Sequence, residues 1–299
     1  MAEFLQQLIN GLSLGAIYAL IALGYTMVYG VLRFINFAHA DVFMVGAVIG
    51  LEVGQHLPEG TLWGGLLVLV AAMAGCALLG VVIERLAYRP LRGTATLNVL
   101  ITAIGVSLLL ESVLQHPSVF GATPRAFPAV FPVKNFAVGG LAVSSSQLAV
   151  IAVAAALMLA LQWIVHRTRL GTAMRAVALN PQAAQLVGVN IGTVISFTFA
   201  LGSALAGAGG VLYALNYPTV DPLMGVMPGL KAFVAAVLGG IGNIPGAALG
   251  ALLLGVVETF VAGSSQLSSF KDAIAFAILI AVLLVRPAGL LGKFTPEKV

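Results

Sequence analysis

The sequence predicts an all-α membrane protein, a bundle of about eight or nine helices that cross the bilayer. Of its 299 residues, 60% are hydrophobic and 8% are charged, and the mean hydropathy is +1.08. Soluble domains carry roughly 25% charged residues. The apolar residues also gather into runs, most of them near the roughly 20 residues that a helix needs to span a bilayer. We therefore expect residues 1–299 to form a single transmembrane domain.

Nine apolar runs follow one another along the chain, and two of them are short for a full crossing. They cover about residues 5–31, 40–55, 62–83, 97–115, 147–165, 191–215, 229–240, 244–262 and 272–286. The seventh run is short and is flanked by Pro228 and by a glycine-rich stretch that includes Gly239 and Gly240. Broken or re-entrant membrane helices have these features, so we expect one near residues 229–245.

Basic residues are distributed unevenly between the two sets of loops. With nine crossings and the N-terminus outside, four basic residues fall outside: Arg125, Lys134, Lys231 and Lys271. Ten fall inside: Arg33, Arg85, Arg89, Arg92, Arg167, Arg169, Arg175, Arg286, Lys293 and Lys298. Because loops rich in Lys and Arg stay in the cytoplasm, residues 166–190 are expected to be cytoplasmic. Residues 116–146, which contain several prolines, are then the largest external loop and are expected to form an ordered, irregular cap.

The loop of residues 166–190 is a polar, basic segment between two long apolar runs. Residues 171–179 are rich in helix formers, and Asn180 can cap a second short helix that begins at Pro181. The arginines alone would only fix the topology, but the uncharged pattern around them indicates a docking surface. We assign to it Arg167, Arg169, Gly171, Arg175, Ala176, Asn180, Pro181, Ala183, Ala184, Leu186 and Gly188.

A few carboxylates lie in or beside the apolar runs, where a charge costs at least about 2.5 kcal/mol. They are Asp41, Glu52, Glu111 and Glu258. Most lie within about a turn of a span end, where a carboxylate can be hydrated or can snorkel; Glu258 fits this explanation least. Our candidates for a transport path or gate are Asn36, His39, Asp41, Glu258, Gly239, Gly240 and Asn243.

The sequence gives no sign of enzymatic chemistry. It lacks paired carboxylates, metal-ligand spacings and the GxxxxGK[ST] phosphate-binding loop. The basic residues are scattered singly, so we expect no nucleic-acid partner. We therefore expect no catalytic, cofactor or metal site in this chain, and any ATP that drives it would be hydrolysed by another subunit.

Several segments resemble the H-type permease subunit of high-affinity branched-chain amino acid importers of the ABC class. GTAMRAVALNPQAAQL, at residues 171–186, looks like the coupling loop of ABC importer permeases. The other similar segments are residues 15–47, 84–93, 97–111, 231–258 and 283–292. One departure is Ala40-Asp41, where the family commonly has Gly-Glu.

This resemblance implies a permease of the bacterial cytoplasmic (inner) membrane that works in a complex. The implied partners are a second, M-type permease, two cytoplasmic ATPases that use the ATP, and a periplasmic or extracellular solute-binding protein, with membrane lipid around the bundle. Leucine, isoleucine and valine are the implied cargo, while similar permeases import other amino acids, short amides or urea. An ion-coupled secondary transporter, with its ion site at residues 239–246, and a passive channel are the alternatives from other classes.

Overall fold

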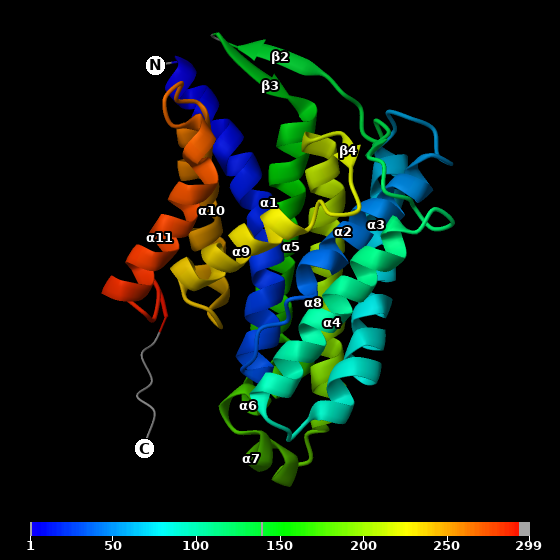
Figure 1. Ribbon diagram of the computed structural model, residues 1–299, viewed down its shortest axis with the longest axis vertical. Helices are drawn as coiled ribbons and strands as arrows, with labels where there is room; N and C mark the ends of the chain where they lie inside the picture. Colours follow the sequence, from blue (N-terminus) through cyan, green and yellow to red (C-terminus); the bar gives the residue numbers. More distant parts are fainter. Residues whose placement is uncertain (1, 139, 293–299) are drawn as a thin grey trace.

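The computed structural model describes residues 2–138 and 140–292 and confirms a polytopic, all-α membrane protein. Eleven α-helices occur in this part of the chain (Figure 1). Seven are long and apolar enough to cross a membrane. They are α1 (Ala2–Leu32), α3 (Leu62–Ile83), α4 (Thr96–Gln115), α5 (Ser145–Arg167), α8 (Ile191–Asn216), α10 (Ile244–Ala262) and α11 (Lys271–Val285). The last reaches this length together with the 3-10 turn before it, Ser268–Phe270.

Two further helices, α2 (His39–Gly54) and α9 (Val226–Gly239), are too short for a full crossing and lie at mid-height in the bundle (Figure 1). Each follows a non-helical segment: α1 ends before Arg33, which has a positive φ of 59°, and α9 follows the turns after α8. The predicted break is confirmed, because α9 stops at Gly239 and α10 starts at Ile244. Gly240, between them, has a φ of 107°, which glycine adopts readily.

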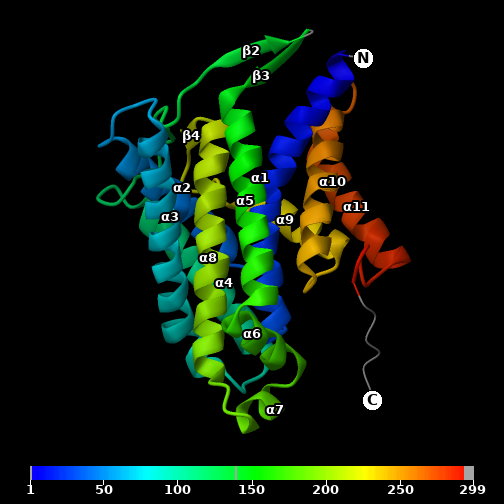
Figure 2. The same ribbon diagram turned by 180° about the vertical axis from the view of Figure 1, so that it is seen from behind.

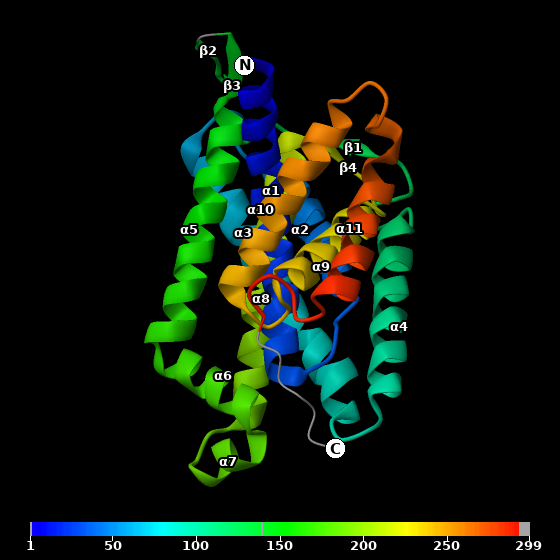
Figure 3. The same ribbon diagram turned by 90° about the vertical axis from the view of Figure 1, so that its left-hand side faces the viewer.

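Helix α1 runs through the middle of the bundle, with α8, α9 and α10 packed around it (Figure 3). Its close contact with α10 depends on small residues: a Cβ on Gly15 would lie 2.8 Å from the Cα of Leu252, and Gly255 packs against Gly11 and Gly15. Without a hydrophobic driving force between helices in lipid, such close backbone packing is what holds membrane helices together.

The two ends of the bundle differ. At one end, β2 (Asn135–Val138) and β3 (Leu141–Ser144) form an antiparallel hairpin near the N-terminus (Figure 2). There too, β1 (Arg125–Ala126) pairs with β4 (Thr219–Val220). We expected an irregular cap over residues 116–146, and the structure adds these strands. Pro132 is the last proline of the cap, so the residues beyond it are free to pair as β2 and β3.

At the opposite end, α6 (Arg169–Leu179) and α7 (Pro181–Leu186) project beyond the other helices (Figures 1 and 2). The loops after α1 and α3 also lie at this end, so most of the basic residues counted as internal gather here. One assignment was wrong: Lys231, counted in an external loop, is buried inside α9. Lys293 and Lys298 lie outside the described residues.

Candidate functional site: a helical hairpin and a buried charge network

The α6–α7 hairpin is built by two caps that the sequence encodes locally. The Thr168 hydroxyl accepts a hydrogen bond from the Gly171 amide at 3.1 Å and starts α6. The Asn180 side chain accepts one from the Ala183 amide at 2.9 Å and starts α7, with Pro181 in its first turn. The predicted pair of short helices, capped by Asn180, is confirmed. These caps give the hairpin a defined shape.

The hairpin has an anchored side and a free side. Gly171, Met174 and Val177 recur every three residues on α6 and are buried. A side chain at Gly171 would run into the carbonyls of Ile164 and Val165 at the end of α5. The Arg33 guanidinium, after α1, donates to the carbonyl of Ala178 at 3.3 Å. The anchored side therefore ties α6 to both α5 and α1.

The free side presents apolar side chains that nothing in the described chain covers. Leu179 is 85% exposed, Leu186 is 89% exposed, and Val187 is also exposed, whereas Ala184 faces inward and is buried. Gly188, with a φ of 85°, ends the hairpin. Exposed apolar residues at the tip of a projecting, well-capped element are typical of a protein–protein contact.

A network of buried charges links four helices in the half of the bundle that carries the β2–β3 hairpin. The Lys231 ammonium of α9 lies 2.5 Å from Glu258 Oε1 on α10 and 2.6 Å from Asp272 Oδ1 on α11. The Tyr18 hydroxyl of α1 donates to Glu258 Oε2 at 3.0 Å. Lys231 and Glu258 are buried, while the Asp272 side chain is 41% exposed. Because a buried charge requires a partner, these contacts fix α9 against its neighbours.

Two cavities meet at this charge network. The smaller, of about 180 Å³, is lined by Tyr18, Lys231, Glu258 and Asp272 among others. The larger, of about 390 Å³, shares Glu258 with it. The larger cavity has a mostly polar lining: Gln7, Asn10, Gln147, Asn216 and Lys271. The start of α1, the start of α5 and the end of α8 form its walls, so it lies toward the end that carries the β2–β3 hairpin.

The start of α2 holds a second buried polar cluster. Asn36 Oδ1 accepts a hydrogen bond of 2.5 Å from the Tyr88 hydroxyl, and an Asp41 carboxylate oxygen accepts one of 2.5 Å from Ser107 on α4. His39 packs edge-on against Tyr25, with ring centroids 4.9 Å apart, and fills the space that Gly24 leaves without a side chain. From the sequence we expected the Asp41 carboxylate to lie near a span end and to be hydrated. That expectation was wrong, because Asp41 is only 1% exposed.

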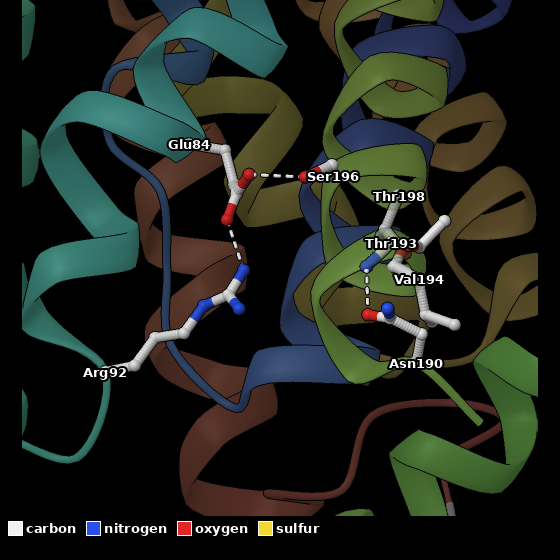
Figure 4. Close-up of polar contacts among 7 residues, drawn as sticks. All are labelled: Glu84, Arg92, Asn190, Thr193, Val194, Ser196 and Thr198. Carbon is white, nitrogen blue, oxygen red and sulfur yellow. Dashed lines mark hydrogen bonds and ion pairs between the residues drawn. The ribbon is translucent and has the colours of Figure 1, made fainter. Parts of the chain in front are cut away.

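A third buried carboxylate, Glu84, lies where α3 gives way to a π-helical turn (Glu84–Tyr88). Figure 4 shows its carboxylate between Ser196 on α8, whose hydroxyl donates to it at 2.6 Å, and the guanidinium of Arg92. A π turn inserts an extra residue into the helix. Glu84 thus points inward while Arg85 and Leu86 point outward.

The sequence pattern of a known family covers almost all of this framework. The family, described as the permease component of a branched-chain amino acid transport system, matches residues 7–283. The chain belongs to this family. The resemblance inferred from the sequence is thereby confirmed.

Several relatives of this branched-chain amino acid permease match it along nearly its whole length. It is 44% identical over 303 residues to the high-affinity branched-chain amino acid transport system permease protein BraD of Pseudomonas aeruginosa, which covers 99% of this chain and 98% of that protein. It is 42% identical over 306 residues to LivH of Escherichia coli, a protein of the same description, with the same coverage. In contrast, the galactose/methyl galactoside import permease MglC of Escherichia coli matches only part of the chain: the match covers 55% of this chain and 52% of that protein, at 30% identity.

Among solved structures, the permease is similar in fold to PsaBC from Streptococcus pneumoniae, determined in complex with a Fab. The TM-score is 0.50, the two chains are 13% identical, and the match covers 95% of this chain and 92% of the other. At this identity the comparison supports the helical fold alone.

Sequence reasoning missed two buried charges of the permease. Lys231 was counted in an external loop although it lies within the seventh apolar run, residues 229–240, and Glu84 was left just beyond the end of the third run, residues 62–83. Both are buried and ion-paired. A signal for Glu84 was present, because the apolar pattern continues past it through Ala87 and Tyr88.

The glycine-rich break between α9 and α10 is hydrogen-bonded to the segment that follows α11. The Leu290 and Leu291 amides donate to the carbonyls of Leu238 and Gly239 at 2.8 and 3.0 Å. Asn243 caps α10 through the Gly246 amide and donates to the Leu291 carbonyl at 2.7 Å. Figure 3 shows this last segment curling against the turn. These carbonyls are therefore engaged rather than free for an ion, and the role of Gly239, Gly240 and Asn243 in a path stays a prediction.

In residues 2–138 and 140–292, no group of three or more His, Cys, Asp or Glu side chains is placed to hold a metal ion.

Proposed function

We propose that this permease carries leucine, isoleucine and valine across the bacterial cytoplasmic membrane as one subunit of an ATP-driven importer. The observation that supports this most directly is the projecting α6–α7 hairpin, whose exposed apolar tip lies at the basic end of a bundle of this family. By the positive-inside rule, that end faces the cytoplasm and the β2–β3 hairpin faces the outside. Residues 166–190 are then a cytoplasmic coupling loop and residues 116–146 an external loop.

The proposed complex contains a second, M-type permease, two cytoplasmic ABC ATPases and an external solute-binding protein. The ATPases use the ATP, because this chain has no phosphate-binding loop and so supplies no cofactor site of its own. The two relatives that match nearly the whole chain, BraD and LivH, are described as permeases for branched-chain amino acids. The scattered basic residues give nucleic acid no binding face.

In this proposal, the hairpin converts movement of the ATPases into movement of the bundle. Leu179, Leu186 and Val187 dock on an ATPase, while Gly171 and Ala184 keep the hairpin seated. Because Arg33 bonds α6 to the end of α1, a pull on α6 reaches the segment that leads into α2. The coupling loop therefore has a short mechanical route to the buried cluster of Asn36, His39 and Asp41.

The proposed path begins in the polar cavity at the external end. Gln7, Asn10 and Asn216 line this cavity together with Glu258, and the Lys231–Glu258 pair lines the smaller cavity beside it. Separation of this pair would free α9 from α10 and open the way inward. Glu258, Asn36, His39 and Asp41 therefore remain our candidates for path or gate residues.

The experiment is co-purification and uptake with the reconstituted importer. Leu186→Glu places a charge on the exposed tip without disturbing the fold, and should lose the ATPases and the uptake of labelled leucine. Val119→Glu, at an apolar site that is 53% exposed at the other end, is the control and should retain both. Bulky residues at Gly171, Ala176 or Ala184 should uncouple transport while the chain still inserts.

The same reconstituted importer tests the cargo. Uptake of labelled leucine, isoleucine and valine should exceed uptake of urea and of short amides by at least about tenfold, the ratio that a 1.4 kcal/mol difference in binding gives. Retention of the ATPases and of full uptake by Leu186→Glu would contradict the coupling role. Preferential uptake of urea, an amide or another amino acid would contradict the cargo alone.

A further inference from the structure

A groove between the end of α3 and the start of α8 combines arginines with an apolar wall. Its volume is about 370 Å³. Arg85, Arg89, Thr193 and Ser196 line its polar part, and Val81 and Phe197 line its apolar part. The groove lies at the end of the bundle that carries α6 and α7. It is therefore amphipathic along its length.

The polar part of the groove is prepared for an anion. Within residues 2–138 and 140–292, Arg92 forms an ion pair with Glu84, whereas Arg85 and Arg89 form none. Arg85 and Arg89 are both exposed. A Cβ on Gly192 would lie 3.7 Å from Nη2 of Arg89 and 3.7 Å from Nη1 of Arg92, so two guanidiniums approach the first turn of α8. Figure 4 shows Arg92 turned toward Glu84, which leaves Arg85 and Arg89 as the uncompensated charges.

The position of these arginines along α3 matches the depth of lipid headgroups. Exposed apolar side chains run down the outer face of α3: Leu67, Val70, Leu78 and Val82. Arg85 and Arg89 follow on the same exposed surface within the next two turns. A face that changes from apolar to cationic in this way passes from the acyl chains to the phosphate layer.

We infer that this groove binds one anionic phospholipid of the leaflet at the α6–α7 end. The lipid phosphate is held by Arg85 and Arg89, whose planar guanidiniums suit phosphate oxygens, and the Thr193 and Ser196 side chains lie beside it. An acyl chain lies along Val81 and Phe197. A free phosphate ion would use the arginines alone, so the apolar wall favours a lipid as the occupant.

The test is native mass spectrometry of the purified chain in mild detergent, titrated with dioleoylphosphatidylglycerol or dioleoylphosphatidylcholine. The chain should retain one phosphatidylglycerol in preference to phosphatidylcholine. Arg85→Gln/Arg89→Gln should weaken this retention about tenfold or more, since each basic residue at a membrane surface contributes on the order of 1 kcal/mol. Arg89→Gln alone should weaken it less, and it serves if the double variant does not fold.

The control is Arg169→Gln, which removes the same charge from an exposed site at the same end but outside the groove. It should retain phosphatidylglycerol like the unaltered chain. Three outcomes would overturn the inference: equal retention of the two lipids, an equal loss in Arg169→Gln, or displacement of the lipid by millimolar inorganic phosphate. The last would identify a free-anion site.

Discussion

At the scale of single residues, the Lys231–Glu258 pair dominates the interior. Lys231 has two carboxylate partners, Glu258 and Asp272, whereas Glu258 has one ammonium and the Tyr18 hydroxyl. Loss of one partner from a buried pair leaves an uncompensated charge and costs about 3–5 kcal/mol. The arrangement is therefore asymmetric: Lys231 can lose Glu258 and still be paired, but Glu258 cannot lose Lys231.

We predict that Lys231→Met destabilises the permease by about 3 kcal/mol and Glu258→Gln by less, because Asp272 still neutralises Lys231 in the second variant. The measurement is the apparent melting temperature of the purified protein in detergent. The double variant should melt above Lys231→Met, since it buries no unpaired carboxylate at position 258.

Glu52→Gln is the control for this comparison. Its ion pair with Arg125 is 3.5 Å long and exposed, and such a pair contributes at most about 1 kcal/mol. If the melting temperature of Glu258→Gln is equal to or lower than that of Lys231→Met, the asymmetry is absent. Glu258 and Asp272 then do not share the positive charge of Lys231.

At the scale of helices, glycines decide how closely α1 and α10 approach. Gly11 and Gly15 on α1 face Gly255 on α10, and backbone atoms of Leu252 and Val256 occupy the space where side chains would be. The short helices α2 and α9 then fit beside α1 at mid-height, where they bring Asp41 and Lys231 into the interior. Close helix packing thus positions the candidate path.

We expect Gly15→Ala to push α1 away from α10, because the new methyl group meets backbone that cannot rotate away. The cost of such overpacking is about 1–3 kcal/mol, again measured as a lower melting temperature. Gly30→Ala is the matched control on the same helix, where the nearest atom is 3.8 Å from the added Cβ. Equal melting temperatures for the two variants would show that the helices separate without cost.

At the scale of the whole molecule, the two ends have different chemistry. One carries the β2–β3 hairpin and the entrance to the polar cavity, and the other carries α6, α7 and most of the basic residues. The molecule is therefore asymmetric along its long axis, as a protein with one fixed orientation in the membrane should be.

Labelling with a membrane-impermeant maleimide tests this orientation. The native Cys76 is fully buried, so the unaltered protein should remain unlabelled. Lys134→Cys should be labelled in intact spheroplasts, and Leu186→Cys only in inverted membrane vesicles. The reverse pattern would place α6 and α7 outside and would contradict a cytoplasmic coupling loop.

Much of this protein is determined by the sequence alone, because lipid restricts what a chain can do. Apolar runs of the required length must form helices, so the spans and the break after Gly239 were predictable. The capped helices α6 and α7 were also predictable, since Asn180 and Pro181 act on neighbouring backbone. These features depend on contacts within a few residues.

Only the tertiary structure decided which charges are buried and what they contact. Asp41 is buried because α4 brings Ser107 to it, Glu84 because α8 brings Ser196, and Lys231 because Glu258 and Asp272 converge on it. These partners lie between 27 and 112 residues apart in the sequence where hydrogen bonds join them. Helical periodicity gives the direction of a side chain on its own helix but not the neighbour that it meets, because helix packing sets that neighbour.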